Sequence, residues 1–122
     1  MRNPVNWFEI YVEDMGRARE FYETVLGVKL ERLPVDGIEM WNFPMHEDGA
    51  GAAGSLIHVP GFPVGKNSVL VYFSCEDCSV EESRVDAAGG KVEKSKFSIG
   101  QFGFVSLVHD TEGNMIGLHS MS

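Results

Sequence analysis

An internal repeat constrains this fold more than any other feature of the sequence. Asp14 and a stretch ending at Gly27 reappear as Asp77 and a stretch ending at Gly90, at a constant offset of about 63 residues. Self-similarity at a fixed period indicates one structural unit used twice. We therefore expect two similar halves.

The first copy reads as a strand followed by a helix. Alternating apolar residues over positions 8–12 of "WFEIYVED" have the period of a half-buried strand. From Met15 to Leu26 the apolar residues recur at steps of three and four, which predicts an amphipathic helix. Asp14 suits its N-cap and Gly27 its left-handed C-cap.

The second copy repeats this order. "LVYFSCED" alternates in the same way, Asp77 follows, Ser79 and Glu82 have the spacing of a capping box, and Gly89 and Gly90 end the expected helix. Three short β-rich runs follow in each copy, "KLERL", "IEMWNF" and "GSLIHV" in the first and "KVEKSKF", "FGFVSLVH" and "MIGLH" in the second. Each unit is therefore predicted to be one strand, one helix and three strands.

These units predict an α+β fold of two βαβββ modules in a pseudo-twofold arrangement. A length of 122 residues suits one domain, here 1–122, with modules at about 1–60 and 68–122 and a Pro- and Gly-rich linker at about 61–67. A helix covers only one face of each sheet. We expect the bare faces to form a curved sheet around a cavity that binds a small molecule.

Charge and hydropathy exclude several partners. The net charge of −8 has no basic stripe to offset it, so nucleic acid is not expected. No apolar run is long enough to cross a bilayer, so no membrane association is expected. The start "MRNPVNWFEI" lacks the pattern of an export signal, which favours a cytoplasmic location.

The segment "GAGAAG" at 49–54 matches the glycine spacing of dinucleotide-binding loops. A dinucleotide loop opens a helix, whereas this segment runs into the predicted strand "SLIHV". We therefore reject a dinucleotide cofactor. His46 and Glu47 lie just before it, and we interpret them as part of a surface loop.

Cys75 and Cys78 form a C-x-x-C motif between a strand and a helix, a context found in redox pairs. The repeat aligns them with Val12 and Met15, which are apolar core positions in the first copy. Free cysteine behaves as a small buried hydrophobe. Buried thiols are therefore favoured over redox activity.

Three segments together resemble the vicinal oxygen chelate superfamily, which includes glyoxalase I, bleomycin and fosfomycin resistance proteins and extradiol dioxygenases. They are "FEIYVEDMGRAREFYETVLGVKL", "VYFSCEDCSVEESRVDAAGGKV" and "VHDTEGNMIGLH". The resemblance extends over the whole chain and implies the paired-module fold. It also implies a homodimer, since members of the family are usually dimeric.

The resemblance further implies a divalent metal held by one residue from the first and one from the last strand of each module. Those positions fall on Trp7, Gly54, Leu70 and Gly117. None offers the imidazole, carboxylate or thiolate that such metals need. We therefore expect no metal cofactor, and we expect Trp7 and Leu70 to fill the space beside the two glycines.

A relocated metal site is the alternative. A shift of two residues along a strand keeps the same face. It leads to Glu9, Tyr72, His119 and, depending on a gap, Leu56 or His58. Glu9, His58 and His119 could hold Zn, Ni, Fe or Mn in a glyoxalase-related lyase or isomerase, or in a dioxygenase. A single strand histidine is more often solvated or hydrogen-bonded.

Glu9 is the most informative polar residue, since it shares a strand face with Trp7. It could act as a general base or bind a cationic group, or it could be satisfied by backbone donors or an arginine. The predicted pocket residues are Trp7, Glu9, Tyr11, Trp41, His58, Leu70, Tyr72 and His119. They favour a protein that binds a small apolar or aromatic molecule, with catalysis left open.

Overall fold

The computed structural model describes residues 3–122 and confirms the α+β class with two βαβββ modules. The first module contains β1 (Trp7–Tyr11), α1 (Met15–Leu26), β2 (Glu31–Leu33), β3 (Glu39–Asn42) and β4 (Ala53–His58). The second contains β5 (Tyr72–Ser74), α2 (Cys78–Glu82), β6 (Lys91–Ser98), the short 3-10 helix η1 (Gly100–Phe102), β7 (Phe104–His109) and β8 (Met115–Ser120).

The two sheets have the same topology. Their strand orders are β1-β4-β3-β2 and β5-β8-β7-β6. In each sheet the first strand of the module pairs in parallel with the last, and the remaining pairs are antiparallel. We call these sheet A and sheet B. Their matching order is the structural form of the sequence repeat.

Helix α1 has the caps that its sequence predicts. The Asp14 carboxylate accepts a hydrogen bond from the backbone N–H of Arg17, and Gly27 ends the helix at φ +67°. A left-handed residue at this position is typical of glycine. The buried stripe consists of Met15, Ala18, Phe21, Tyr22 and Val25.

Helix α2 is shorter than expected and is capped differently. Asp77 is its N-cap, with its carboxylate accepting from both the backbone N–H and the hydroxyl of Ser79. Glu82 does not complete a capping box, because its carboxylate accepts from the Lys96 backbone N–H and the Ser106 hydroxyl. Beyond Glu82 the chain continues in turns to Gly89, where several backbone N–H groups bond to carbonyls three residues back, as Arg84 does to Glu81.

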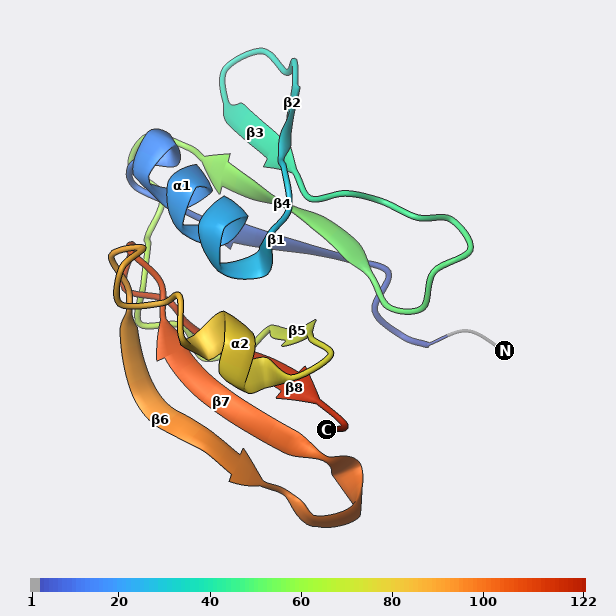
Figure 1. Cartoon of the computed structure of the whole chain (residues 1–122). Helices are drawn as coiled ribbons and strands as arrows, with labels where there is room; N and C mark the ends of the chain where they lie inside the picture. The colour runs from blue at the N-terminus through green and yellow to red at the C-terminus, as the bar shows by residue number, and fades with distance from the viewer. Residues whose placement is uncertain (1–2) are drawn as a thin grey trace.

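The modules meet through their helices. Figure 1 shows α1 and α2 on the sides of the two sheets that face one another. Tyr22 of α1 packs edge-on against Phe43 at 5.7 Å and lies 5.9 Å from Phe73 of β5. We call the opposite side of each sheet its outer face. Because these outer faces point away from each other, they do not enclose the expected cavity within one chain.

A buried polar network also joins the modules. Glu112, in the turn before β8, accepts hydrogen bonds from the backbone N–H groups of Glu13 and Asp14 and from the Arg17 guanidinium. The Tyr22 hydroxyl donates to Asp110 at 2.6 Å. Both carboxylates belong to the second module and their partners to the first, so the network fixes the start of α1 against sheet B.

Within residues 3–122, no helix has the length and apolar character needed to cross a membrane.

Candidate functional site

Three side chains of β1 form a polar and aromatic group on the outer face of sheet A. Phe8 and Ile10 face the helices, which leaves Trp7, Glu9 and Tyr11 on the other side. The Trp7 indole N–H donates to Glu9 at 3.3 Å and the Tyr11 hydroxyl donates at 2.9 Å. The two aromatic donors thus hold an exposed carboxylate in one orientation.

Tyr11 is itself held in place. Its ring stacks on Phe62 of the inter-module segment, with ring centres 4.0 Å apart. The hydrogen bond to Glu9, partial burial and the negative charge of Glu9 all raise the pKa of Tyr11. The phenol therefore stays protonated as a donor to Glu9 at neutral pH.

Two more polar groups lie beside Glu9. Ser55 of β4 is the register partner of Glu9, and Asn42 of β3 is the register partner of Ser55. The Ser55 hydroxyl oxygen and the Asn42 amide oxygen are buried without a hydrogen-bond partner in residues 3–122. Buried polar atoms normally have partners, so these two oxygens leave an unmet hydrogen-bond requirement beneath Glu9.

This register corrects one predicted metal position. Glu9 and Tyr72 are equivalent in the repeat, and they pair with Ser55 and Gly117 respectively. Ser55, rather than Gly54, is therefore the counterpart of Gly117, and the first module carries a one-residue gap. The four family positions become Trp7, Ser55, Leu70 and Gly117. These residues do not fit a divalent metal, because none supplies imidazole, carboxylate or thiolate.

The expected packing against the glycines occurs with different partners. Phe8 packs over Gly54 and the Tyr72 ring packs over Gly117, so closely that a Cβ at either glycine would overlap the ring. The prediction that Trp7 and Leu70 fill the space beside these two glycines was wrong. In each case the ring comes from the residue directly beside the glycine in the parallel strand pair.

The alternative metal set does not come together in the chain. His58 turns away from Glu9, with its Nδ1 atom 2.9 Å from the carbonyl oxygen of Val12. The Nε2 atom of His119 lies 2.7 Å from the carbonyl oxygen of Phe102. Within residues 3–122, no three His, Cys, Asp or Glu side chains are placed to hold a metal ion.

Trp41 also lies apart from Glu9. Its ring packs under the Arg19 guanidinium of α1 at 3.5 Å, and its indole N–H donates to Glu39 at 3.1 Å. Trp41 therefore belongs to the helix-bearing side of sheet A. The alternation of "IEMWNF" alone does not reveal which side is buried.

The outer face of sheet B carries an apolar groove of about 390 Å³. It brings together the predicted Tyr72 and His119 with four residues that sequence reasoning missed, and its lining is Tyr72, Phe97, Ile99, Val105, Leu107 and His119. Leu70 precedes β5 and is 38% exposed. Phe97 and Ile99 alternate at the end of β6 and just beyond it, and Val105 and Leu107 alternate along β7, a period-two signal that would have identified them once the outer face was known.

Both cysteines are free, and Cys78 is buried as predicted, whereas Cys75 is only partly buried. Burial, together with the negative charge of Glu81 and a hydrogen bond to it, raises the pKa of Cys75 to about 12. A thiol with so high a pKa is a poor nucleophile at neutral pH, which disfavours redox exchange.

Comparisons with known proteins agree with this architecture. The chain is 27% identical to CFP32 of Mycobacterium bovis, a protein named as a proposed glyoxylase, over 93% of the chain but only 44% of CFP32. The chain thus spans less than half the length of this relative. Maize glyoxalase I has a TM-score of 0.76 at 20% identity, covering 97% of this chain and 46% of the maize chain.

TnmS3, an antibiotic binding protein from Streptomyces sp. CB03234, has a TM-score of 0.69 at 25% identity, with 99% of this chain and 98% of TnmS3 covered. Residues 5–118, which are almost the whole chain, match the sequence model of one family. The chain belongs to the Glyoxalase/Bleomycin resistance protein/Dioxygenase superfamily.

Proposed function

We propose that this protein is a homodimer that binds a small, largely aromatic molecule between the outer face of sheet A in one copy and the outer face of sheet B in the other. The observation that carries the proposal is the opposite direction of the two outer faces in a single chain. Each is half of a cavity, and only a second copy can supply the other half.

The two faces are complementary in chemistry. The outer face of sheet A presents the Glu9 carboxylate, and the unpartnered oxygens of Ser55 and Asn42 are buried beside it. The groove on sheet B is apolar and contains Tyr72, which is 52% exposed. Ligand sites commonly combine apolar walls with a few fixed polar groups. The ligand therefore places its ring system on sheet B and a hydrogen-bond donor at Glu9.

We propose that binding does not use the divalent metal of the family. This rests on Trp7, Ser55, Leu70 and Gly117, which offer no suitable ligand at the four inherited positions. The description of TnmS3 as an antibiotic binding protein supports the binding of a small molecule by this fold.

The test uses N-phenyl-1-naphthylamine, a fluorescent aromatic probe with one N–H donor. We expect saturable binding to protein purified without chelator, and we expect elemental analysis to show less than one bound metal per ten chains. Leu107→Arg places a charge in the apolar groove and should weaken probe binding at least about tenfold. Val80→Arg, at an exposed position of α2, is the matched control and should have no effect on probe binding.

Binding that survives Leu107→Arg unchanged would contradict the assignment of the groove. A stoichiometric metal that the probe requires would contradict the metal-free part of the proposal.

A further inference from the structure

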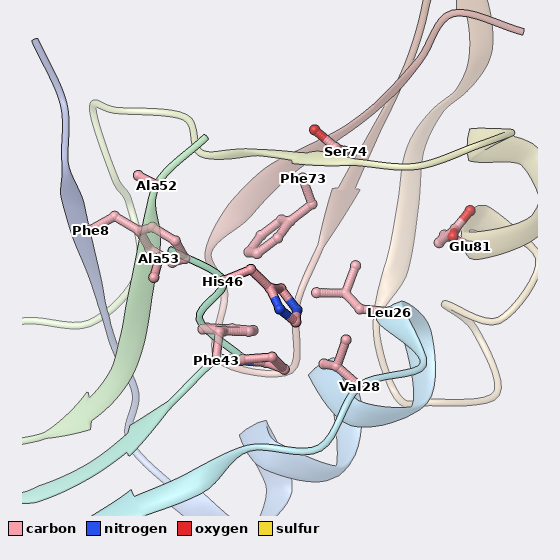
Figure 2. A pocket seen from close by; sticks show the side chains of 11 residues that line it. Phe8, Leu26, Val28, Phe43, His46, Ala52, Ala53, Phe73, Ser74 and Glu81 are labelled. Carbon is pink, nitrogen blue, oxygen red and sulfur yellow. The ribbon is translucent and has the colours of Figure 1, made fainter. Parts of the chain in front are cut away.

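A second cavity, here called the seam pocket, lies between the two modules on the helix-bearing side. Its volume is about 250 Å³. Figure 2 shows Phe8 and Phe43 of the first module on one side, Phe73 and Glu81 of the second module on the other, and Leu26 between them. This pocket is separate from the outer faces, because Phe8 and Phe73 point towards the helices. Its size suits one aromatic ring with a short side chain.

Three phenyl rings give the seam pocket an aromatic wall. The ring centres of Phe8 and Phe43 are 5.5 Å apart, those of Phe8 and Phe73 are 5.8 Å apart, and those of Phe43 and Phe73 are 5.6 Å apart. Phe8 and Phe73 are only partly buried. Aromatic pairs prefer tilted or edge-to-face contacts at these separations, so a further ring can join the cluster.

Glu81 places a carboxylate at the seam pocket, and this carboxylate has no strong hydrogen-bond donor beside it. Its Oε1 atom is buried and has no hydrogen-bond partner in residues 3–122. The Cys75 thiol faces the same carboxylate, and a thiol is a weak donor. A buried carboxylate oxygen that lacks a donor is costly, and a charged N–H group is its strongest partner.

His46 completes the opposite side of the pocket. It comes from the glycine-rich loop between β3 and β4, and Figure 2 shows its imidazole directed towards Leu26 and Val28. The pocket therefore has an imidazole on the first module, a carboxylate on the second and an apolar floor between them. A ligand for it must combine a ring with a polar end.

We propose that the seam pocket binds a small aromatic amine, with its ring against Phe8 and Phe73 and its ammonium group donating to Glu81. The net charge of −8 favours a cationic ligand over an anionic one. This site is independent of the function proposed for the outer faces, and either assignment can fail without the other.

The experiment is an NMR titration of ¹⁵N-labelled protein with 2-phenylethylamine, compared with the neutral 2-phenylethanol and the anionic 3-phenylpropionate. We expect saturable shifts at the amides of Val28, Phe73 and Glu81 with the amine. The alcohol should bind about tenfold more weakly, because it lacks the charge-assisted hydrogen bond. The anion should not saturate.

The Trp7 indole N–H reports separately on the outer face, where it donates to Glu9. The outer face is proposed to take an aromatic ring and an N–H donor, so the amine can shift the Trp7 resonance as well, and the shifts of Phe73 and Glu81 alone decide the seam pocket. A titration that moves Trp7 and leaves Phe73 and Glu81 unmoved would overturn the seam pocket while supporting the outer-face site. Equal affinity for the amine and the alcohol would overturn the role of Glu81.

Two variants sharpen the test. Glu81→Gln keeps the shape of the side chain and removes its charge, so amine affinity should fall about tenfold while alcohol affinity stays the same. Glu76→Gln, on the exposed stretch before α2, is the matched control and should leave the affinity for the amine unchanged. The series of three ligands on the unmodified protein decides the proposal even if Glu81→Gln does not fold.

Discussion

At the scale of single residues, two glycines allow close contact between aromatic rings and the sheets. A Cβ at Gly54 would overlap both the Phe8 ring and the Phe8 carbonyl oxygen, and backbone cannot easily move away. We predict that Gly54→Ala lowers the free energy of unfolding by about 2 kcal/mol or more, as overpacking does.

Urea unfolding with an unchanged m-value would measure this loss. Gly16→Ala is the control, because a Cβ there would meet only the Asp14 carboxylate at 3.6 Å. Within α1 this change should be neutral or stabilise by up to roughly 1 kcal/mol. Equal effects of the two substitutions would contradict the packing argument.

The chemistry of Cys75 is also decided at this scale. Burial and the charge of Glu81 raise the pKa of its thiol to about 12. The thiolate is the reactive form, so at pH 8 native Cys75 should react with a disulfide reagent more than about 100-fold more slowly than it does in urea. A Cys75 thiol that reacts as fast in the native protein as in urea would reopen the redox hypothesis.

At the scale of elements, the sequence predicted well wherever local chemistry alone decides the structure. Helix α1 has its apolar stripe, Asp14 N-cap and Gly27 C-cap inside one continuous segment, and it was predicted correctly. The prediction for helix α2 was too long, because the backbone beyond Glu82 forms three-residue turns, and the Glu82 carboxylate binds the distant residues Lys96 and Ser106 instead of completing a capping box. The Ser55 register was missed for a related reason, since pairing with β1 is not visible in the sequence of β4.

The joint between α1 and the second module depends on Glu112. Burial on its own would raise the pKa of this carboxyl, but hydrogen bonds from Arg17, the Asp14 backbone, Thr111 and the Glu13 backbone lower the pKa to about 2. Because the folded pKa lies below the unfolded value, the stabilisation is complete above about pH 5 and is lost as pH falls towards 2.

We predict that Glu112→Gln lowers the free energy of unfolding at pH 7 by about 2 to 3 kcal/mol, and that the difference from the unmodified protein shrinks between pH 5 and pH 2. Denaturant unfolding at a series of pH values would show this. Glu20→Gln, on the exposed side of α1, should change stability by less than about 0.5 kcal/mol at every pH. A difference that does not depend on pH would contradict the ion-pair explanation.

At the scale of the whole molecule, the sequence could show that each module has a covered and a bare sheet face but not which faces meet. The modules could meet through their helix-covered faces or through their bare faces, and the apolar pattern of the helices is the same in both cases. What selects the observed one is long-range: Tyr22 reaches Asp110 and the Arg84 guanidinium donates to the carbonyl of Val25. These contacts join residues that are far apart in the sequence, so hydrophobic periodicity cannot predict them. The four groove residues that the sequence did not predict, Phe97, Ile99, Val105 and Leu107, could be identified only once this choice was known.

The same arrangement gives a sharp test of the proposed dimer. If each cavity combines sheet A of one copy with sheet B of the other, then Glu9→Arg damages the first half and Leu107→Arg damages the second. Each variant alone should bind N-phenyl-1-naphthylamine at least about tenfold more weakly.

Unfolding and refolding an equal mixture of the two would produce heterodimers in which one cavity carries both substitutions and the other carries neither. Random pairing makes about half of the dimers heterodimers, so about a quarter of all cavities should recover full affinity. Each variant refolded separately is the control and should not recover its affinity for the probe. Recovery would require cavities that span two copies, whereas a cavity built within one chain would show no recovery in the mixture.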